Sequence, residues 1–340
     1  LKKNTNKVKK IIKFSKKSSD ISSIKKDFFS SNKIYLKDAI KINKLYSKQI
    51  KRKKCKNCNF NIKNTTFVSH HVKYSICDRC SHLNGMYEDT NSFNKKIYLS
   101  ESGSNYINSY RKNFNLRVKK IYQPKVEFLK KVLKKNFSII EVGCGAGQFI
   151  KASENKNIKA KGIDINKDLI NLGSKYLKMN KIELVKHNNI FKLIKESEAN
   201  VCVLIHTLEH LQDPDLFMRK LKKTKVKYLF INIPLFSFST FVENVFKNVY
   251  PRHLSADHTH LYSKKSLEYF IKKHNFKVLG EWWFGSDISD LFRSMLLNSN
   301  FRNDKFIEYF QKYFGEHIDI IQSVFDKKKL SSEVHMVLKI

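Results

Sequence analysis

The sequence contains no apolar run that approaches the roughly 20 residues needed to span a bilayer, so we expect no transmembrane segment. Its lysine-bearing N-terminus also lacks the apolar stretch of a secretory signal. Cysteine is not scattered as in small secreted scaffolds, because four of the six cysteines form two close pairs. These absences lead us to expect a protein of the reducing cytoplasm.

Acidic residues are few: 30 Asp and Glu stand against 67 Lys and Arg, a formal net charge of +37. Residues 1–54 alone hold 19 basic and 3 acidic residues, a difference of +16, and we expect residues 1–31 to be a mobile arm. Such an excess is typical of proteins that bind nucleic acid. The abundance of Lys, Asn and Ile also indicates an AT-rich coding sequence, which we favour as its cause. Nucleic acid bound through the arm is the alternative.

The chain is long and apolar enough to fold. Its 340 residues can bury the core of one large or two medium domains. The hydrophobic fraction of 41% and the aromatic fraction of 13% are those of a globular protein. We divide the chain into a basic arm with a short helix (1–50), a cysteine module (51–85), a helical connector (86–136) and a main domain (137–340).

The main domain alternates short apolar segments with helix-compatible ones. This order is typical of an α/β fold with a parallel sheet. The predicted strands are 138–142, 159–163, 182–186, 200–205, 227–233, 276–284 and 333–340. The predicted helices are 147–154, 167–178, 190–197, 214–223 and 266–273, and residues 286–330 form an additional helical insertion.

The paired cysteines follow the pattern C-x-x-C, 18 residues, C-x-x-C, with a predicted hairpin between the pairs. Four thiolates at this spacing can surround Zn²⁺ tetrahedrally, and a site closed by four cysteines is structural, not catalytic. An iron site of the rubredoxin type is the alternative. The predicted ligands are Cys55, Cys58, Cys77 and Cys80.

Three glycines at alternate positions, Gly143, Gly145 and Gly147, follow the first predicted strand and precede a helix. Such a turn lets the backbone approach a ligand, and the amide N–H groups of the helix start then face it. A nicotinamide-binding turn would have its third glycine at position 148, where this chain has glutamine. Asp164 ends the second strand, where a carboxylate can accept both hydroxyls of a ribose.

These motifs resemble those of the Rossmann-like methyltransferases that depend on S-adenosylmethionine (SAM). Their first motif reads E-x-G-x-G-x-G, as does the segment from Glu141 to Gly147, and many also have the segment L-E-H-x-x-D-P found here at 208–214. The resemblance covers residues 120–285 and the final strand. It implies that SAM is bound by Glu141, Gly143, Gly145, Gly147, Asp164, Ile165, Asn188, Asn189 and His206.

Histidines cluster after the fourth and fifth strands, at the edge where α/β proteins bind ligands. The segment His258-x-His260-Leu261 resembles one that covers the substrate cavity of sugar C-methyltransferases, with threonine at the acidic position. We expect His258 or His260 to be the general base, because imidazole titrates near neutral pH. His206 and His210 are the second candidates. Tyr106, Tyr110 and Arg111 of the connector are expected to cover the cofactor or substrate.

The cysteine module ahead of a SAM domain also resembles sugar C-methyltransferases and related glycan-pathway enzymes. The resemblance therefore implies a small-molecule acceptor, a nucleotide-linked sugar or a surface-glycan precursor. A metal-assisted RNA 2′-O-methyltransferase is the alternative, because Glu209, His210 and His258 resemble part of the metal site of such enzymes. A SAM-binding or zinc-binding adaptor without catalysis is a third possibility. The sequence does not determine the oligomeric state.

Overall fold

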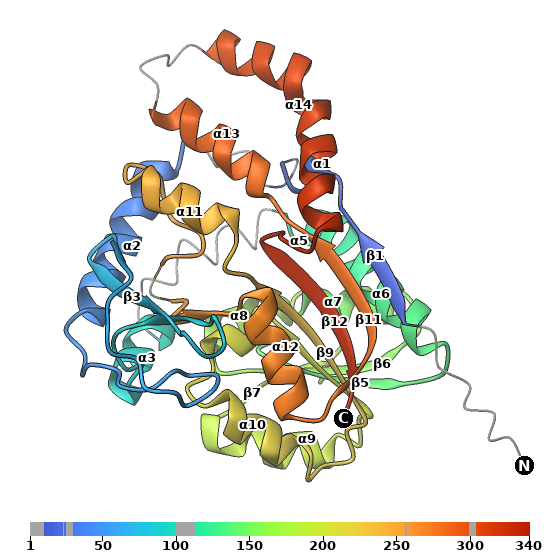
Figure 1. The fold of residues 1–340 in the computed structure, drawn as a ribbon. Coiled ribbons are helices and arrows are strands. Elements are labelled where there is room, and N and C mark those ends of the chain that lie inside the picture. The colour runs from blue at the N-terminus through green and yellow to red at the C-terminus, as the bar shows by residue number, and fades with distance from the viewer. Residues whose placement is uncertain (1–9, 23, 25–29, 100–112, 256, 299–303) are drawn as a thin grey trace, which may run out of the picture.

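The computed structural model describes the chain except residues 1–9, 23, 25–29, 100–112, 256 and 299–303. Tyr106, Tyr110 and Arg111 lie outside the described residues. Figure 1 shows a twisted central sheet with helices on both faces, and a smaller unit, built mainly from the early part of the chain, to its left.

Eight strands form the central sheet, and the seven strands predicted from the sequence are among them. Their order is β1-β11-β12-β9-β8-β5-β6-β7; β12 is antiparallel to its two neighbours and the other pairs are parallel. The bounds are β1 (Ile11–Phe14), β5 (Ser138–Val142), β6 (Lys159–Asp164), β7 (Ile182–Leu184), β8 (Val201–Ile205), β9 (Tyr228–Pro234), β11 (Lys277–Phe284) and β12 (Glu333–Lys339). The predicted α/β fold with a Rossmann-like sheet is confirmed.

Helices cover both faces of this sheet because its strands are apolar on both sides. One hydrophobic cluster packs α6 (Gln123–Leu133), α7 (Gln148–Glu154) and α8 (Lys167–Gly173) against one face. A second packs α9 (Ile190–Glu196), α10 (Pro214–Leu221) and α12 (Lys264–Lys273) against the other. The carboxyl ends of the parallel strands therefore remain available at one edge for ligands.

The expectation that residues 1–31 form a mobile arm is wrong for residues 11–14. These residues form β1, which adds a parallel strand to the edge of β11, and α1 (Ser18–Ser22) follows. The indole Nε1–H of Trp282 donates to the backbone oxygen of Ser15 at 2.9 Å, and Lys13 lies over the Trp282 ring at 3.6 Å. The lysine-rich composition around residues 11–14 gives no strand pattern. These residues form a strand only because they pair with the edge of β11, which lies far along the chain.

The cysteine module contains the predicted hairpin as β2 (Phe67–Ser69) and β3 (Val72–Ile76), followed by β4 (Leu83–Gly85). Its fourth strand, β10 (His260–Leu261), comes from the main domain, so that the order is β10-β4-β3-β2. The short helix expected within residues 1–50 is α2 (Asn32–Tyr46). The connector contains α3 (Asn91–Leu99), α5 (Phe114–Arg117) and the π-helical turn η3 (Val118–Tyr122).

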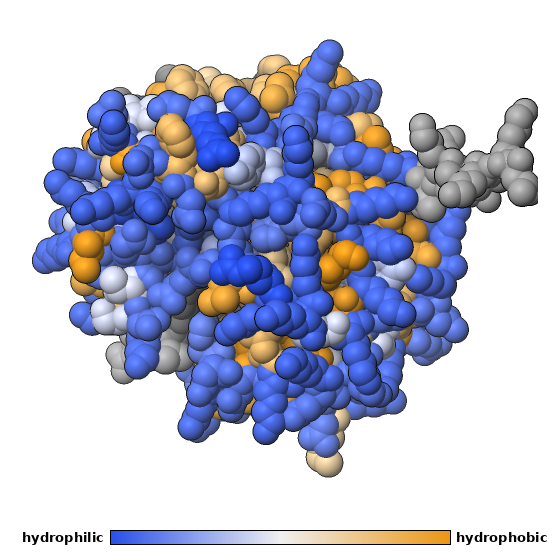
Figure 2. All heavy atoms as spheres, turned by 60° about the horizontal axis from the view of Figure 1, so that its bottom comes forward, coloured by the Kyte–Doolittle hydropathy of each residue, from blue (hydrophilic) through white to orange (hydrophobic). Residues whose placement is uncertain are grey.

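The helical insertion consists of α13 (Asp287–Asn298) and α14 (Asp304–Lys327), and α11 (Phe238–Val245) lies beside α13 (Figure 1). On the face shown in Figure 2, hydrophilic side chains predominate and hydrophobic ones form scattered patches. None of the helices in the described part of the chain combines the length and hydropathy that crossing a bilayer requires.

Candidate active site

The glycine turn connects β5 to α7, and all three glycines have positive φ, between +55° and +74°. A Cβ on Gly143 would lie 2.6 Å from Oγ1 of Thr207, whereas a Cβ on Gly145 would meet nothing closer than 3.9 Å. The backbone N–H of Gly145 donates to Asp164 at 2.7 Å. The turn thus joins the ends of two neighbouring strands and leaves open space over Gly145.

Asp164 ends β6 and is largely buried. Burial raises its pKa, while the N–H donors of Asn166 and Gly145 act in the opposite direction. Next to it, Ile165 is partly buried against the second hydrophobic cluster. Asn188 and Asn189 are exposed in the 3₁₀ turn η4 (His187–Asn189), which follows β7. These residues therefore lie along one edge of the sheet, beside the glycine turn.

Glu141 and Gln148 are buried on either side of the turn, at 2% and 1% exposure. Burial raises the pKa of Glu141 well above its ordinary value; Lys125 opposes this shift and Asp164 adds to it. Among the described residues, neither Oε2 of Glu141 nor Nε2 of Gln148 has a hydrogen-bond partner. Orphaned buried polar atoms beside a glycine turn fit a polar ligand such as the nucleoside of SAM.

Three of the four candidate histidines lie together after β8 and before β10. His206 follows β8 with φ of +49°, and the 3₁₀ turn η5 (Leu208–His210) carries Glu209 and His210. The ligand atoms of Glu209, His210 and His258 all lie within 4.8 Å of one another. The rings of His210 and His258 are 5.0 Å apart. The structure therefore brings His206, His210 and His258 around one fully buried carboxylate.

The environments of these groups differ. Nδ1 of His210 lies 2.6 Å from the Asp257 carbonyl, which can only accept, so this nitrogen carries the proton. Burial lowers the pKa of His258, which Asp257 partly offsets, and its buried Nδ1 has no hydrogen-bond partner within the described residues. Burial also disfavours ionised Glu209, but His206, His210 and His258 hold its pKa below the ordinary value. A neutral imidazole thus stands beside an ionised carboxylate.

His206 is half-exposed between two carboxylates: Nδ1 lies 3.3 Å from Glu209 and Nε2 lies 3.5 Å from Glu333. Desolvation acts to lower its pKa, but the two carboxylates outweigh it and raise the pKa above the ordinary value. Glu333, at the start of β12, also accepts from Asn232 at 2.6 Å, and Asn232 in turn accepts from Lys125. Burial lowers the pKa of Lys125 to about 8.

Sequence reasoning missed Lys125, Asn232 and Glu333. Asn232 carried a signal, because it is a polar residue between Ile231 and Ile233 in a strand that is otherwise apolar. Lys125 and Glu333 carried none, since each stands in a charged or helical context that is usually solvated. Their grouping depends on β12 running antiparallel beside β9, which places the start of β12 at the carboxyl edge.

His260 is separate from the other three. It is 1% exposed, and its Nδ1 lies 2.9 Å from Nε2 of His82 in the cysteine module. Burial, aided by Lys56, lowers its pKa well below the ordinary value. In this arrangement the Nδ1 side of His260 faces the module and contacts His82.

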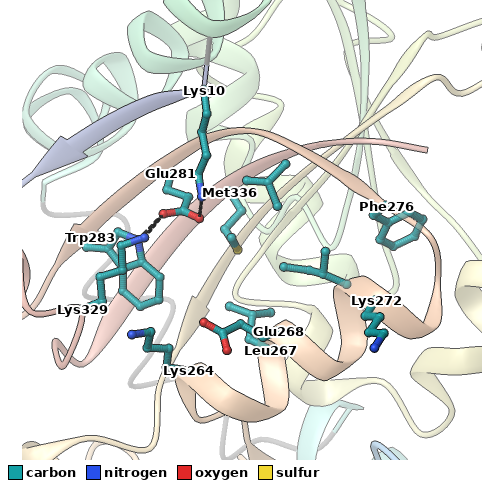
Figure 3. Close-up of a pocket in the computed structure, with 12 residues that line it drawn as sticks. Lys10, Lys264, Leu267, Glu268, Lys272, Phe276, Glu281, Trp283, Lys329 and Met336 are labelled. Carbon is teal, nitrogen blue, oxygen red and sulfur yellow. Dashed lines mark hydrogen bonds and ion pairs between the residues drawn. The ribbon is translucent and has the colours of Figure 1, made fainter. Parts of the chain in front are cut away.

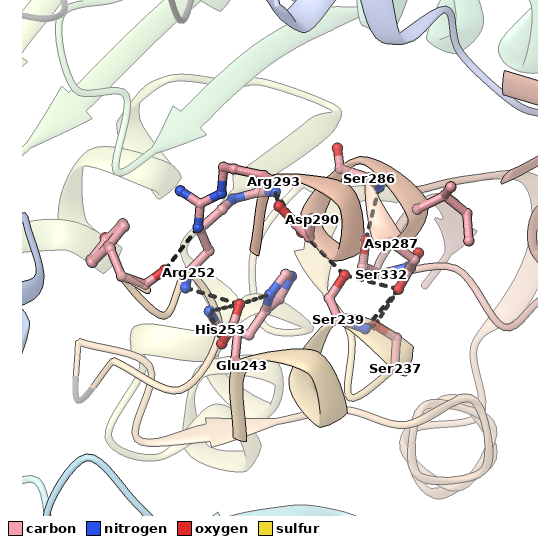
Figure 4. Close-up of polar contacts among 12 residues, drawn as sticks. Ser237, Ser239, Glu243, Arg252, His253, Ser286, Asp287, Asp290, Arg293 and Ser332 are labelled. Atoms are coloured by element: carbon pink, nitrogen blue, oxygen red, sulfur yellow. Dashed lines mark hydrogen bonds and ion pairs between the residues drawn. The ribbon is translucent and has the colours of Figure 1, made fainter. Parts of the chain in front are cut away.

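The helices α11 and α13 fix the segment that leads to His258 (Figure 4). Glu243 on α11 accepts hydrogen bonds of 2.9–3.0 Å from the backbone N–H groups of residues 252–254. Arg252 donates to both oxygens of Asp290 on α13 at 2.8 Å. α11 and α13 therefore hold this segment against the main domain.

The four paired cysteines converge on one point in the module. Sγ of Cys55 lies 3.7 Å from that of Cys80, and Sγ of Cys58 lies 3.5 Å from that of Cys77. All four sulfurs lie within 4.8 Å of one another and all four residues are buried. A tetrahedron with Zn–S bonds of about 2.3 Å has sulfurs about 3.8 Å apart, so these cysteines fit Zn²⁺.

A pocket of about 390 Å³ lies elsewhere, between α12 and the β11–β12 part of the sheet (Figure 3). Trp283, Met336 and Leu267 form its apolar part, and Glu281 binds Lys10 and Lys329 at its margin. None of the predicted site residues lines it, so we assign it no part in the candidate site.

Residues 114–281, just under half of the chain, match a family model described as a methyltransferase domain. A comparison with curated proteins gives no match.

Solved structures with a similar fold include a SAM-dependent methyltransferase from Archaeoglobus fulgidus, with 16% identity, coverage of 74% of this chain and 100% of that one, and a TM-score of 0.42. The plantazolicin methyltransferase BpumL in complex with SAH has 14% identity and a TM-score of 0.45, and the match covers 72% of this chain and 92% of that one. The methyltransferase domain of bacterial CtHen1-CN has 13% identity and a TM-score of 0.42, and the match covers 66% of this chain and 100% of that one. At these TM-scores no residue role is carried over. The match to a methyltransferase domain, the glycine turn and the Rossmann-like sheet together support SAM-dependent methyltransferase activity.

Proposed function

We propose that this enzyme methylates a small molecule, a nucleotide-linked sugar or surface-glycan precursor, with His258 as the general base. The observation that carries the proposal is the group of His258, His210 and Glu209 at the carboxyl edge of the sheet. We place the enzyme in the cytoplasm, where its cysteines stay reduced.

The cofactor residues support SAM binding at the turn. Gly143, Gly145 and Gly147 let the backbone approach the ligand, and Asp164 has carboxylate oxygens at the end of β6 for ribose hydroxyls. When bound, SAM supplies a methyl group on a positively charged sulfur. Asn188, exposed after the neighbouring strand, is available for the adenine edge.

His258 suits proton removal from the acceptor because its imidazole is neutral and one of its nitrogens lacks a partner. Glu209 is ionised beside it and stabilises the imidazolium that proton transfer creates. The Asp257 carbonyl fixes the tautomer of His210, and the His210 ring lies next to the His258 ring. We further propose that Zn²⁺ bound by the four cysteines has a structural role.

The first experiment incubates the enzyme with methyl-labelled SAM and two separate pools, nucleotide sugars and total RNA. Label in the sugar pool supports the proposal, and label in RNA alone rejects it. His258→Ala should lower turnover at least ~100-fold, the usual scale for loss of a general base. His317→Ala, at an exposed position on α14, is the matched control and should keep normal turnover.

A second candidate function is metal-assisted methylation of RNA. It is favoured by the same group, because Glu209, His210 and His258 lie close enough to hold a divalent cation. A histidine that ligates a metal commonly donates its other N–H to a carbonyl, as His210 does to Asp257. The high net charge would then help to hold the phosphate backbone.

Metal and salt dependence distinguish the two functions. After treatment with a chelator, the metal-assisted reaction should return with added Mg²⁺ or Mn²⁺, beyond any recovery that Zn²⁺ alone gives through the cysteine module. RNA binding should also weaken steeply with salt, by orders of magnitude between roughly 50 and 200 mM. Sugar turnover that needs only Zn²⁺ and changes little with salt excludes the RNA function.

A further inference from the structure

The backbone that follows His258 belongs, by its hydrogen bonds, to the cysteine module. His260 pairs with Asn84 and Leu261 with Leu83, so β10 is the edge strand of the module's sheet. The N–H of Gly85 donates to the Thr259 carbonyl at 2.9 Å. About 175 residues of sequence separate these partners, yet they form one antiparallel ladder directly after His258.

A line of buried side chains crosses the same boundary. His82 of the module is 0% exposed; its Nε2 lies 2.9 Å from Nδ1 of His260, and its Nδ1 lies 3.2 Å from Oγ of Ser266 on α12. The Ser266 hydroxyl donates to the Ser263 carbonyl, so it accepts from Nδ1–H of His82. His82 then accepts from Nδ1–H of His260. The module therefore fixes the tautomer and the orientation of His260.

The module, together with Asp89 at the start of the connector, also holds the segment that carries His210. Lys56 donates to the Asp89 carboxylate at 2.5 Å and to Thr259 Oγ1 at 3.3 Å. The backbone oxygen of Asp89 accepts from Gln212 at 2.5 Å. Both histidine-bearing segments of the candidate site are thus fastened to one surface, in which Lys56 and Asp89 are buried.

We propose that the cysteine module is part of the acceptor site and that His82 is a positioning residue, which through His260 holds His258 against His210 and Glu209. This inference rests on the proposed role of His258. It gives His260 a task other than proton transfer. It also gives the zinc module a reason to precede this domain, because the metal-held loops carry Lys56 and His82 at fixed positions.

The test compares His82→Ala and His82→Gln, in which the amide can replace one ring hydrogen bond, with the control His71→Ala. His71 is exposed at the tip of the module's hairpin. The measurements are the zinc content, the dissociation constant for SAH by calorimetry, and nitrogen-15 imidazole spectra of histidine-labelled enzyme. Methyl transfer into the nucleotide-sugar pool, with kcat and KM separated, completes them.

We expect His82→Ala to keep one zinc per chain and normal SAH affinity, because the glycine turn and Asp164 do not contact His82. Its His258 and His260 signals should shift, and kcat should fall ~10-fold, the scale of one lost buried hydrogen bond. His82→Gln should recover part of both, and His71→Ala should change neither. Combining His82→Ala with His260→Ala should cost no more than His260→Ala alone, since the first acts through the second.

Unchanged His258 signals in zinc-loaded His82→Ala would overturn the inference, as would additive losses in the double variant. If the wild type methylates nothing in the sugar pool, the proposed function fails, whereas the spectra still decide whether His82 positions His258. If His82→Ala loses zinc, His82→Gln is the variant that tests the inference. Normal imidazole spectra and a normal kcat in His82→Gln would then reject it.

Discussion

At the scale of single residues, proton transfer depends on which imidazole is neutral. Burial holds the pKa of His258 below the ordinary value near 6.5, whereas Glu209 and Glu333 hold the pKa of His206 above it. A base acts only when unprotonated, so activity is lost as the pH falls through the pKa of the base. With His258 as base, kcat/KM should therefore fall only below about pH 6.5. Loss of activity that begins above this value in a pH profile would instead identify His206.

The glycine turn gives a second prediction at this scale. Gly143→Ala adds a Cβ at a φ of +74° and 2.6 Å from Thr207. Strain of about 1–3 kcal/mol at such a position should weaken SAM binding by ~5-fold or more, as measured by calorimetry. The matched control is Gly315→Ala in α14, where a Cβ meets nothing within 4 Å. This control should bind SAM normally and unfold at a slightly higher temperature, because alanine favours a helix.

At the scale of elements, β1 closes the edge of the central sheet. Both tryptophans of the chain contact β1 or the residue after it. Lys13 lies over the Trp282 ring, and the Trp282 indole donates to the Ser15 carbonyl. The N–H of Ser15 donates to the backbone carbonyl of Trp283. Deletion of residues 1–16 should shift the tryptophan fluorescence to longer wavelength and lower the unfolding temperature, because the edge and one indole become exposed. Deletion of residues 1–9 alone retains β1 and is the control. Equal spectra for the two deletions would contradict this role of β1.

At the scale of the whole molecule, the strand β10 joins the main domain to the sheet of the cysteine module, so we expect the two to unfold together. Calorimetry of the zinc-loaded enzyme should therefore give a single cooperative transition. Cys77→Ser should lower the zinc content and the temperature of the whole transition, because the module's sheet includes β10. Cys202→Ala, a buried cysteine of β8, should retain zinc. Two well-separated transitions would show that the module folds independently.

Much of this architecture could be read from local patterns. The parallel strands are runs of apolar, often β-branched residues between helix-compatible segments, and their bounds agree with the structure within about two residues. The insertion and the module's hairpin were equally visible. β1 and β10 were not, because strands of four and two residues carry little pattern and exist only by pairing with an edge.

The candidate site was predicted in part. The glycine turn, Asp164 and the cysteine spacing are local motifs, because each places its chemistry within a few residues. The partition of the histidines is not local: His258 and His260 are two residues apart, yet one faces Glu209 and the other faces His82. Residues i and i+2 of an extended strand face the same side, so the separation of these two histidines depends on the bend at 258–259 that precedes β10, and only the packed module shows what each side contains.

By itself, the sequence determined the fold class, the turn for the cofactor and a four-cysteine cluster, because backbone conformation and metal ligation follow from residues close in the chain. The tertiary structure alone decided which charges meet at the carboxyl edge. Lys125, Asn232, Glu333 and His206 come from four separate segments of the chain, and no local pattern indicates that they meet. An antiparallel last strand and a borrowed edge strand bring such groups together, and the interaction of buried charges depends on distances that no local pattern encodes.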